Sequence, residues 1–303
     1  MQKMRRFLFA VCVSLFATGG TAWGWWSGGH GIMTKAAVQA LPDEVPEFFR
    51  NGERMIAHCS YDPDISKNRG APHVNNAEHP EHYLDLELLQ GKPLPKNRYE
   101  FTQLCTELGT KPDKVGFVPY AVAEWTERLA VAFAEHRKWP NNSFIQSKCL
   151  VYAGFIAHYA QDMCQPLHLT IHFDGWKQAD GSVLHKGIHE KVDALIEYLE
   201  LDPSNLAKDQ TIEPLEDLMA GIVDELHAGF ALLKPVYELG DSLPSFRDKD
   251  WERVPAVVDF ATERAREATR FTAALYLTAW ELSGKIKLEG WLDRAQDDGE
   301  TMK

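Results

Sequence analysis

The sequence lacks the features that mark several common classes of protein. No two cysteines form a CxxC pair, no His-Glu-x-x-His motif occurs and no histidine-rich run is present. These absences argue against a zinc finger, a zinc peptidase and a metal-scavenging protein. The apolar run from Phe7 to Ala17 is shorter than the stretch of about 20 residues that a membrane-spanning helix needs. No segment shows the alternation of a β-strand, and no linker or repeat divides the chain.

The N-terminus has the three-part layout of a secretory signal peptide. Small and polar residues follow the apolar run, and three basic residues precede it: Lys3, Arg5 and Arg6. The small-x-small pattern at residues 22–24 predicts cleavage before Trp25, with cleavage before Trp23 as the alternative. Residues 1–24 are thus expected to be removed, and residues 25–303 to be secreted or periplasmic without a transmembrane anchor.

Apolar residues recur at helical spacing in seven segments, which predicts an all-α fold. These segments are residues 32–41, 45–56, 118–133, 144–163, 188–201, 215–233 and 254–282. Residues 60–116 break the pattern with prolines and polar residues, and only short helices such as 99–108 are expected there. A long irregular stretch in a compact domain is typical of a functional segment. We therefore expect a single multi-helix domain.

The chain is acidic. Its formal charge is −12, and the leader carries three basic residues and no acidic residue, so the mature protein has a formal charge of −15. Such a surface does not suit a protein that binds duplex DNA by neutralising its phosphates. It does suit a protein that holds several divalent cations.

Four cysteines follow the leader: Cys59, Cys105, Cys149 and Cys164. An exported compartment permits disulfides. Cys149 and Cys164 lie on one predicted helix, roughly 22 Å apart at 1.5 Å per residue, so they cannot pair with each other. The other pairings stay open.

The sharpest local pattern is His158-Tyr-Ala-Gln-Asp162-Met-Cys-Gln-Pro166-Leu-His168. His158 and Asp162 are one helical turn apart, so both point to one side of the helix and can share a metal ion. Pro166 ends this helix and leaves His168 on the turn beyond it, where it can face a neighbouring ion.

A second pair, His189 and Asp193, has the same spacing. Together with His168 it would make a site of two nitrogens and one carboxylate, which leaves a position open for water or phosphate. His172 and His185 have spacings that would also allow them to serve as ligands.

The start of the mature chain, Trp25-Trp-Ser-Gly-Gly-His30, offers a further site. A free α-amine has a pKa of about 7.7–8.0 and loses its proton readily to a metal. The amine and carbonyl of Trp25 can therefore chelate an ion, with His30 close by. The irregular stretch adds His82 and Asp64, with Asp62 as the alternative to Asp64.

In this order the residues resemble a known family. Trp, His, Asp and His, followed by His-x3-Asp-x5-His and His-x3-Asp, are the motifs of the zinc-dependent phospholipases C and the single-strand-specific nucleases of the S-one and P-one type. The resemblance spans Trp25 to Asp193. It implies the all-α fold of that family and a cluster of three zinc ions.

The resemblance divides nine ligands among these ions. The first ion would be bound by Asp64, His82, His158 and Asp162. The second would be bound by Trp25, His30 and Asp162. Asp162 and a hydroxide would bridge the first two ions. The third would be bound by His168, His189 and Asp193.

The resemblance also implies catalytic roles for Asp64, Asp162 and Lys67. The bridging hydroxide would attack phosphorus in line, and the third ion would stabilise the departing oxygen. Lys67, three residues after Asp64, would face the scissile phosphate. Tyr83, next to His82, would stack on a base, unless it is a core residue.

Three details favour the nuclease branch: the five-residue spacing from Trp25 to His30, the His-Tyr-Leu-Asp sequence at His82 and the aspartate at position 193. The expected substrate is single-stranded DNA or RNA, and no stable protein partner is implied. Two alternatives remain, a phospholipase C that binds the headgroup of phosphatidylcholine-type lipids and an exported zinc-binding protein without activity.

Overall fold

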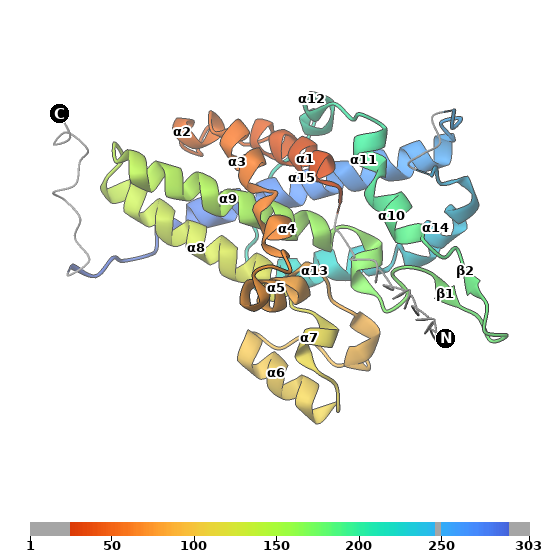
Figure 1. Cartoon of the computed structure of the whole chain (residues 1–303). Helices are drawn as coiled ribbons and strands as arrows, with labels where there is room; N and C mark the ends of the chain where they lie inside the picture. The colour runs from red at the N-terminus through yellow and green to blue at the C-terminus, as the bar shows by residue number, and fades with distance from the viewer. Residues whose placement is uncertain (1–24, 246–249, 291–303) are drawn as a thin grey trace, which may run out of the picture.

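The structure of the chain is built almost entirely of helices (Figure 1). The computed structural model describes residues 25–245 and 250–290, with 65% helix and 2% strand. This composition confirms the all-α prediction. The predicted leader, residues 1–24, lies outside the described residues.

Three long helices form the centre of the molecule: α8 (Val118–Lys138), α9 (Ser143–Met163) and α15 (Pro255–Ser283). α8 and α9 are joined by a short turn and pack against each other, and α15 packs against both. Asn142 starts α9, because its side-chain oxygen accepts hydrogen bonds from the backbone N–H groups of Phe144 and Ile145. The C-terminal half of α9 is almost wholly buried.

Five shorter helices pack against one another and against the long helices. They are α1 (Ser27–Gln39), α2 (Glu47–Arg50), α3 (Glu53–Cys59), α11 (Leu195–Tyr198) and α12 (Pro203–Ala207). α1 packs against α3, α9, α12 and α15. The predicted helix 45–56 is divided at Gly52, where a Cβ atom would stand 2.3 Å from Leu150 Cδ2. A side chain at this position would have to displace the end of the Leu150 side chain.

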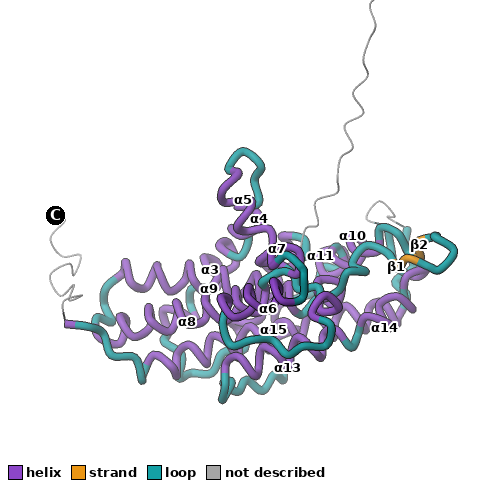
Figure 2. Tube along the Cα trace, turned by 90° about the horizontal axis from the view of Figure 1, so that it is seen from below, coloured by secondary structure: helices purple, strands orange, loops and turns teal. Residues whose placement is uncertain are grey.

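The stretch 60–116, for which the sequence predicted mainly irregular structure, contains a series of short helices. They are α4 (Asp62–Ser66), α5 (Pro72–Glu78), η1 (His79–His82), η2 (Leu86–Leu89), α6 (Arg98–Glu107) and α7 (Pro112–Val115). Prolines begin several of them, because proline fits the first helical turn. α4, α5 and the loop between them project from the helical body (Figure 2).

The remaining elements follow α9. They are η3 (Pro166–Leu169), β1 (Trp176–Lys177), β2 (Val183–Leu184), α10 (Ile188–Asp193), α13 (Leu218–Phe230), α14 (Leu233–Glu238) and η4 (Gly240–Ser242). β1 and β2 pair antiparallel in a hairpin that the sequence did not predict. The predicted helices 188–201 and 215–233 are each interrupted by a turn, so each prediction merged two shorter helices into one.

In the described part of the chain, no helix combines the length and the apolar character needed to span a bilayer. The four cysteines Cys59, Cys105, Cys149 and Cys164 are all buried and free. Disulfides therefore do not hold the described fold together.

One close helix contact links the fold to the histidines of α9. A Cβ atom at Gly154 would lie 2.4 Å from Cys59 Cβ, so only glycine lets α3 approach α9 this closely. The carbonyl of Ser60, the residue after α3, accepts a hydrogen bond from His158 Nδ1 at 2.8 Å. Since His158 is one turn after Gly154, this contact also fixes the ring of His158.

Gly154→Ala should therefore destabilise the fold by about 1–3 kcal/mol, the usual cost of overpacking a well-packed contact. Urea unfolding followed by circular dichroism would measure the loss. Gly290→Ala is the matched control, because a Cβ atom there meets nothing within 4 Å. Equal stability of the two variants would contradict the close contact.

Candidate metal centre

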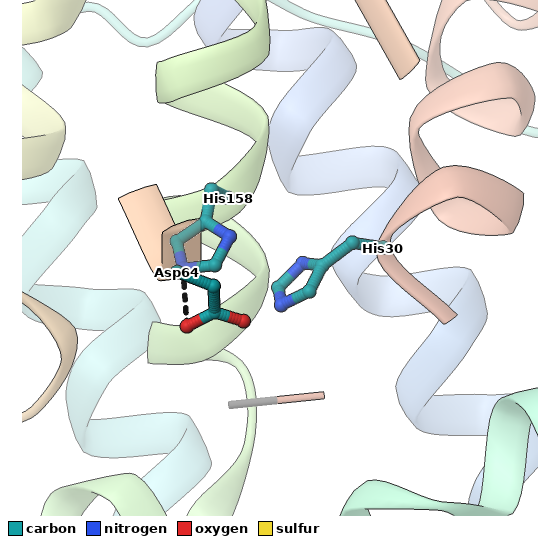
Figure 3. Close-up of side chains that lie close together, drawn as sticks. All are labelled: His30, Asp64 and His158. Carbon is teal, nitrogen blue, oxygen red and sulfur yellow. Dashed lines mark ion pairs between the residues drawn. The ribbon is translucent and has the colours of Figure 1, made fainter. Parts of the chain in front are cut away.

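Eight of the nine predicted ligands have side chains in one buried cluster. α9 contributes His158 and Asp162, and five other elements surround it: α1, α4, η1, η3 and α10. Three groups within the cluster have atoms close enough to bind one ion each: His30, Asp64 and His158; His82, His158 and Asp162; and His168, His189 and Asp193. Figure 3 shows His30, Asp64 and His158 converging from three different helices.

The distances around His158 match a compact metal site. His158 Nε2 lies 2.9 Å from His82 Nδ1 and 3.3 Å from Asp162 Oδ2, and His82 Nδ1 lies 3.0 Å from the same oxygen. Asp64 Oδ1 is 3.8 Å from His158 Nε2 and 4.0 Å from His82 Nδ1. Atoms bound tetrahedrally to zinc at 2.0–2.1 Å stand about 3.3 Å apart. The four atoms thus have the separations of one coordination shell.

Asp162 contacts two groups at once. Its Oδ2 faces His82 and His158, and its Oδ1 lies 3.4 Å from His30 Nε2 and 3.6 Å from His168 Nδ1. The two oxygens of one carboxylate therefore point at different sets of imidazoles. This is the arrangement that a carboxylate bridging two cations requires.

The third group adjoins Asp162 through His168, whose Nδ1 lies 3.6 Å from Asp162 Oδ1. Asp193 Oδ2 is 3.4 Å from His189 Nε2, and Asp193 Oδ1 is 3.8 Å from His168 Nε2. The rings of His168 and His189 have centroids 5.1 Å apart. η3 and α10 thus bring together the three residues that the sequence grouped: His168, His189 and Asp193.

Three histidines have one ring nitrogen hydrogen-bonded away from the cluster. His158 Nδ1 contacts Ser60 O at 2.8 Å, His168 Nδ1 contacts His82 O at 3.1 Å, and His30 Nδ1 contacts Gln161 Oε1 at 2.8 Å. An oxygen acceptor fixes the proton on Nδ1, so Nε2 presents a lone pair. Metal-bound histidines are oriented in this way.

The cluster contains polar atoms that lack the partners a buried atom normally has. His30 Nε2, Asp162 Oδ1 and His168 Nε2 are buried without a hydrogen-bond partner among the described residues. A buried polar atom without a partner costs about 1–3 kcal/mol. Metal coordination would remove this cost for the atoms that face an ion, so the donor set fits divalent cations.

Charges within the cluster are arranged in pairs. Burial by itself would raise the pKa of Asp162, but His158 and His168 hold it well below its ordinary value. Burial opposes protonation of His158, yet Asp162 and Asp64 outweigh it and raise its pKa. Burial lowers the pKa of His168 to about 4. The neutral imidazole, the form that binds a metal, is therefore favoured at His168.

At Asp193 the balance is different. Burial raises the pKa of Asp193 well above its ordinary value, and burial together with His168 lowers that of His189. The Asp193 carboxylate thus has no neighbouring positive charge among the described residues that compensates for its burial. A cation bound between His168, His189 and Asp193 would supply that charge.

A cavity of about 920 Å³ adjoins the cluster. Asp64 and Trp25 line it, so it reaches the predicted ligands. The other lining residues are Trp26, Ser27, Tyr61, Ile65, Lys67, Asn68, Arg69, Asn75, His79, Glu190 and Glu197. This volume is at the upper end of typical ligand sites.

The structure distinguishes the two aspartates that the sequence left open. The carboxylate of Asp64 lies in the cluster, whereas that of Asp62 belongs to none of the three groups and lies near Cys59, where it contributes, after burial, to raising the pKa of the thiol. Lys67, the predicted phosphate-facing residue, lines the cavity, and its Nζ lies 2.5 Å from Asp64 Oδ1.

Trp25 is fully buried, and its indole N–H donates to Gln161 O at 2.9 Å. The next residue is also fixed, because Trp26 N donates to Asp193 O at 3.2 Å. The backbone that would carry the mature N-terminus is thus attached to both α9 and α10.

Tyr83 is not among the residues that line the cavity. Its hydroxyl donates to Asp113 O at 2.8 Å, and its ring meets His79 edge-on at a centroid distance of 6.3 Å. His172 and His185 lie outside the three groups, where His172 stacks on Trp176 and His185 lies 3.6 Å from Asp241.

Two glutamines with roles in the cluster were not predicted. Gln161 Oε1 contacts His30 Nδ1 at 2.8 Å and its Nε2 donates to Thr34 Oγ1 at 3.0 Å, while Gln165 Nε2 donates to Asp193 Oδ1 at 2.7 Å. Both are fully buried. The available signal was an amide side chain on an otherwise apolar helical segment, immediately beside the motif histidines.

Comparison of the chain with protein-family models and with curated proteins finds no match. The chain has a helical fold with several buried groups of histidine and aspartate that could hold metal ions.

Removing divalent cations should lower thermal stability, and adding zinc back should restore it. A ligand at 100 times its Kd stabilises by about 2.7 kcal/mol, which differential scanning fluorimetry detects. Asp162→Asn should lose most of this shift, because Asp162 contacts two groups. His227→Ala, on the exposed surface of α13, is the control. An undiminished shift in Asp162→Asn would contradict the site.

The two glutamines should affect different parts of the cluster. Gln161→Leu should lower the affinity for the ion nearest His30 by about 10–100-fold. Gln165→Leu should lower the affinity for the ion nearest Asp193 by a similar factor. Competition with a chromogenic chelator would measure both, with circular dichroism to verify folding. Identical metal-binding profiles for the two variants would rule out these separate roles.

Proposed function

We propose that the mature chain is a zinc-dependent phosphodiesterase that cleaves single-stranded DNA or RNA, of the kind its motifs resemble. One observation carries the proposal. Eight predicted ligand side chains, supplied by six separate elements, form one buried cluster beside a cavity of about 920 Å³. The convergence of side chains so far apart in sequence supports a shared role in binding metal ions.

In this proposal three zinc ions share the nine ligands as the resemblance implies. Imidazole, carboxylate and main-chain donors suit zinc. The first ion takes Asp64, His82, His158 and Asp162, the second takes Trp25, His30 and Asp162, and the third takes His168, His189 and Asp193. The α-amine of Trp25 becomes available only after removal of the leader.

When bound, the ions would lower the pKa of water and neutralise charge on phosphate oxygens. The side chains around them then act on the substrate. The Lys67 side chain is only 9% exposed and lies at the edge of the cluster, where its ammonium would bind a phosphate oxygen. In a site shielded from water such a charge counts for more than at the surface.

The cavity favours an enzyme over a metal-storage protein. A storage site needs to enclose its ions, whereas here Asp64 and Lys67 line a space large enough for a substrate. Trp26 and Ile65 add apolar surface to the same space, with Ile65 65% exposed. Apolar walls with a few polar groups are typical of substrate sites.

A second function, hydrolysis of a phospholipid, is favoured by one observation. Four exposed apolar residues lie on the segment between His168 and His189: Ile171, Phe173, Val183 and Leu184. The Phe173 ring meets His189 at a centroid distance of 5.5 Å. An apolar edge this close to the cluster would suit contact with a lipid surface.

The test begins with protein expressed with its leader, its N-terminus verified by mass and its zinc counted. About three zinc ions and release of nucleotides from single-stranded DNA or RNA are expected. Chelation should abolish cleavage and zinc restore it. Cleavage of phosphatidylcholine vesicles alone would move the protein to the phospholipase reading, and one zinc ion or none would refute the trinuclear site.

Within the same assay, Lys67→Ala should lower kcat by about 10²–10³-fold, the usual loss when a transition-state charge partner is removed. The zinc content should stay unchanged, because Lys67 is not a ligand in this proposal. Unaltered turnover in the fully loaded variant would remove Lys67 from the mechanism.

A further inference from the structure

The cavity beside the cluster has two unlike walls. The lining from α4, α5 and the turn between them supplies two positive charges, Lys67 and Arg69, and one carboxylate, Asp64, which is paired with Lys67, so one positive charge remains uncompensated. The lining from α10 and α11, the other wall, supplies two carboxylates, Glu190 and Glu197. A polyanion would therefore be attracted to the α4–α5 wall and repelled from the other.

The two cations on this wall are in different states. Lys67 is held 2.5 Å from Asp64 Oδ1 at the edge of the cluster. Arg69 is exposed, and among residues 25–245 and 250–290 it has neither an ion pair nor a hydrogen-bond partner for its side chain. Arg69 is thus a free positive charge on the wall of a cavity in an acidic protein.

The backbone that carries Arg69 is well fixed. Asn75 Nδ2 donates to Lys67 O at 2.6 Å, Gly70 N donates to Asn68 Oδ1 at 2.8 Å, and Ala71 N donates to Asn68 O at 3.0 Å. Two residues of chain span at most about 7 Å. Arg69 is therefore held at a set position next to Lys67, with a long side chain free to reach a group beyond it.

A substrate with one phosphate group would use Lys67 and leave Arg69 without a role. A nucleic-acid strand carries a phosphate at every linkage, and its bases could contact the apolar surface of Trp26 and Ile65 in the same cavity. We propose that Arg69 binds a second phosphate of a single-stranded nucleic acid, next to the phosphodiester held at the cluster. This inference rests on the proposed function and specifies its substrate as a polymer.

The experiment compares substrates of two lengths with zinc-loaded protein. Wild type, Arg69→Ala and Arg69→Lys are assayed on a dithymidine monophosphate and on a 12-residue oligothymidylate. Arg69→Ala should lower kcat/KM on the oligomer about threefold to fivefold, as for one exposed ion pair, and leave the dinucleoside unchanged. Arg69→Lys should keep most of the activity. Arg54→Ala, an exposed arginine on α3, is the matched control.

Salt dependence gives an independent measurement. The slope of log kcat/KM against log salt concentration for the oligomer should become shallower by about 0.7 in Arg69→Ala, the value for one lost contact with a single strand. Equal effects on both substrates, or none on either, would overturn the role of Arg69 while leaving nuclease activity intact. If wild type cleaves neither substrate, or only phosphatidylcholine vesicles, the nuclease proposal itself fails.

Discussion

The arrangement of the whole site depends on one buried carboxylate. Asp162 has no exposed surface, and an isolated charge at such a place would cost several kcal/mol. Imidazoles from α1, η1, α9 and η3 surround it: His30, His82, His158 and His168. Each of these elements must dock against the end of α9 to compensate the charge. The need to satisfy Asp162 thus ties the N-terminal helix and two irregular segments to the central bundle.

This dependence shows which parts of the molecule could be predicted from sequence. The turn-spaced pairs in α9 and α10 need only helical geometry, and Pro166 marks the end of α9, so these parts could be predicted. The long helices α8, α9 and α15 are equally clear from apolar spacing. The break at Gly52 was not predicted, because the neighbour that packs against it, Leu150, is far away in sequence.

Apart from α6, which matches the expected helix 99–108, the short helices of residues 60–116 and the orienting glutamines could not be derived from local pattern. Helices of four or five residues are stabilised by tertiary packing more than by their own sequence. Gln161 is recognisable as important only once His30 and Thr34 from α1 are placed beside it. Conversely, the choice of Asp64 over Asp62 depended on the resemblance. In the structure both lie on α4, and only Asp64 has its carboxylate in one of the three groups.

Under the proposed function, an acidic protein would act on a polyanionic substrate, and the charges that line the cavity would resolve this conflict locally. Charges beyond a Debye length of about 8 Å are largely screened at physiological salt, so the formal charge of −12 counts for less than the groups that line the site. Divalent ions at the cluster would outweigh its three carboxylates, and Lys67 and Arg69 extend that positive field along one wall. The acidic residues Glu190 and Glu197 line the same cavity from α10 and α11. Glu197 also accepts a hydrogen bond from Gly28 N at 3.0 Å, so part of the repulsive wall serves to hold the segment that carries Trp25. The same carboxylate would then help to position the N-terminus and help to direct the substrate to the other wall.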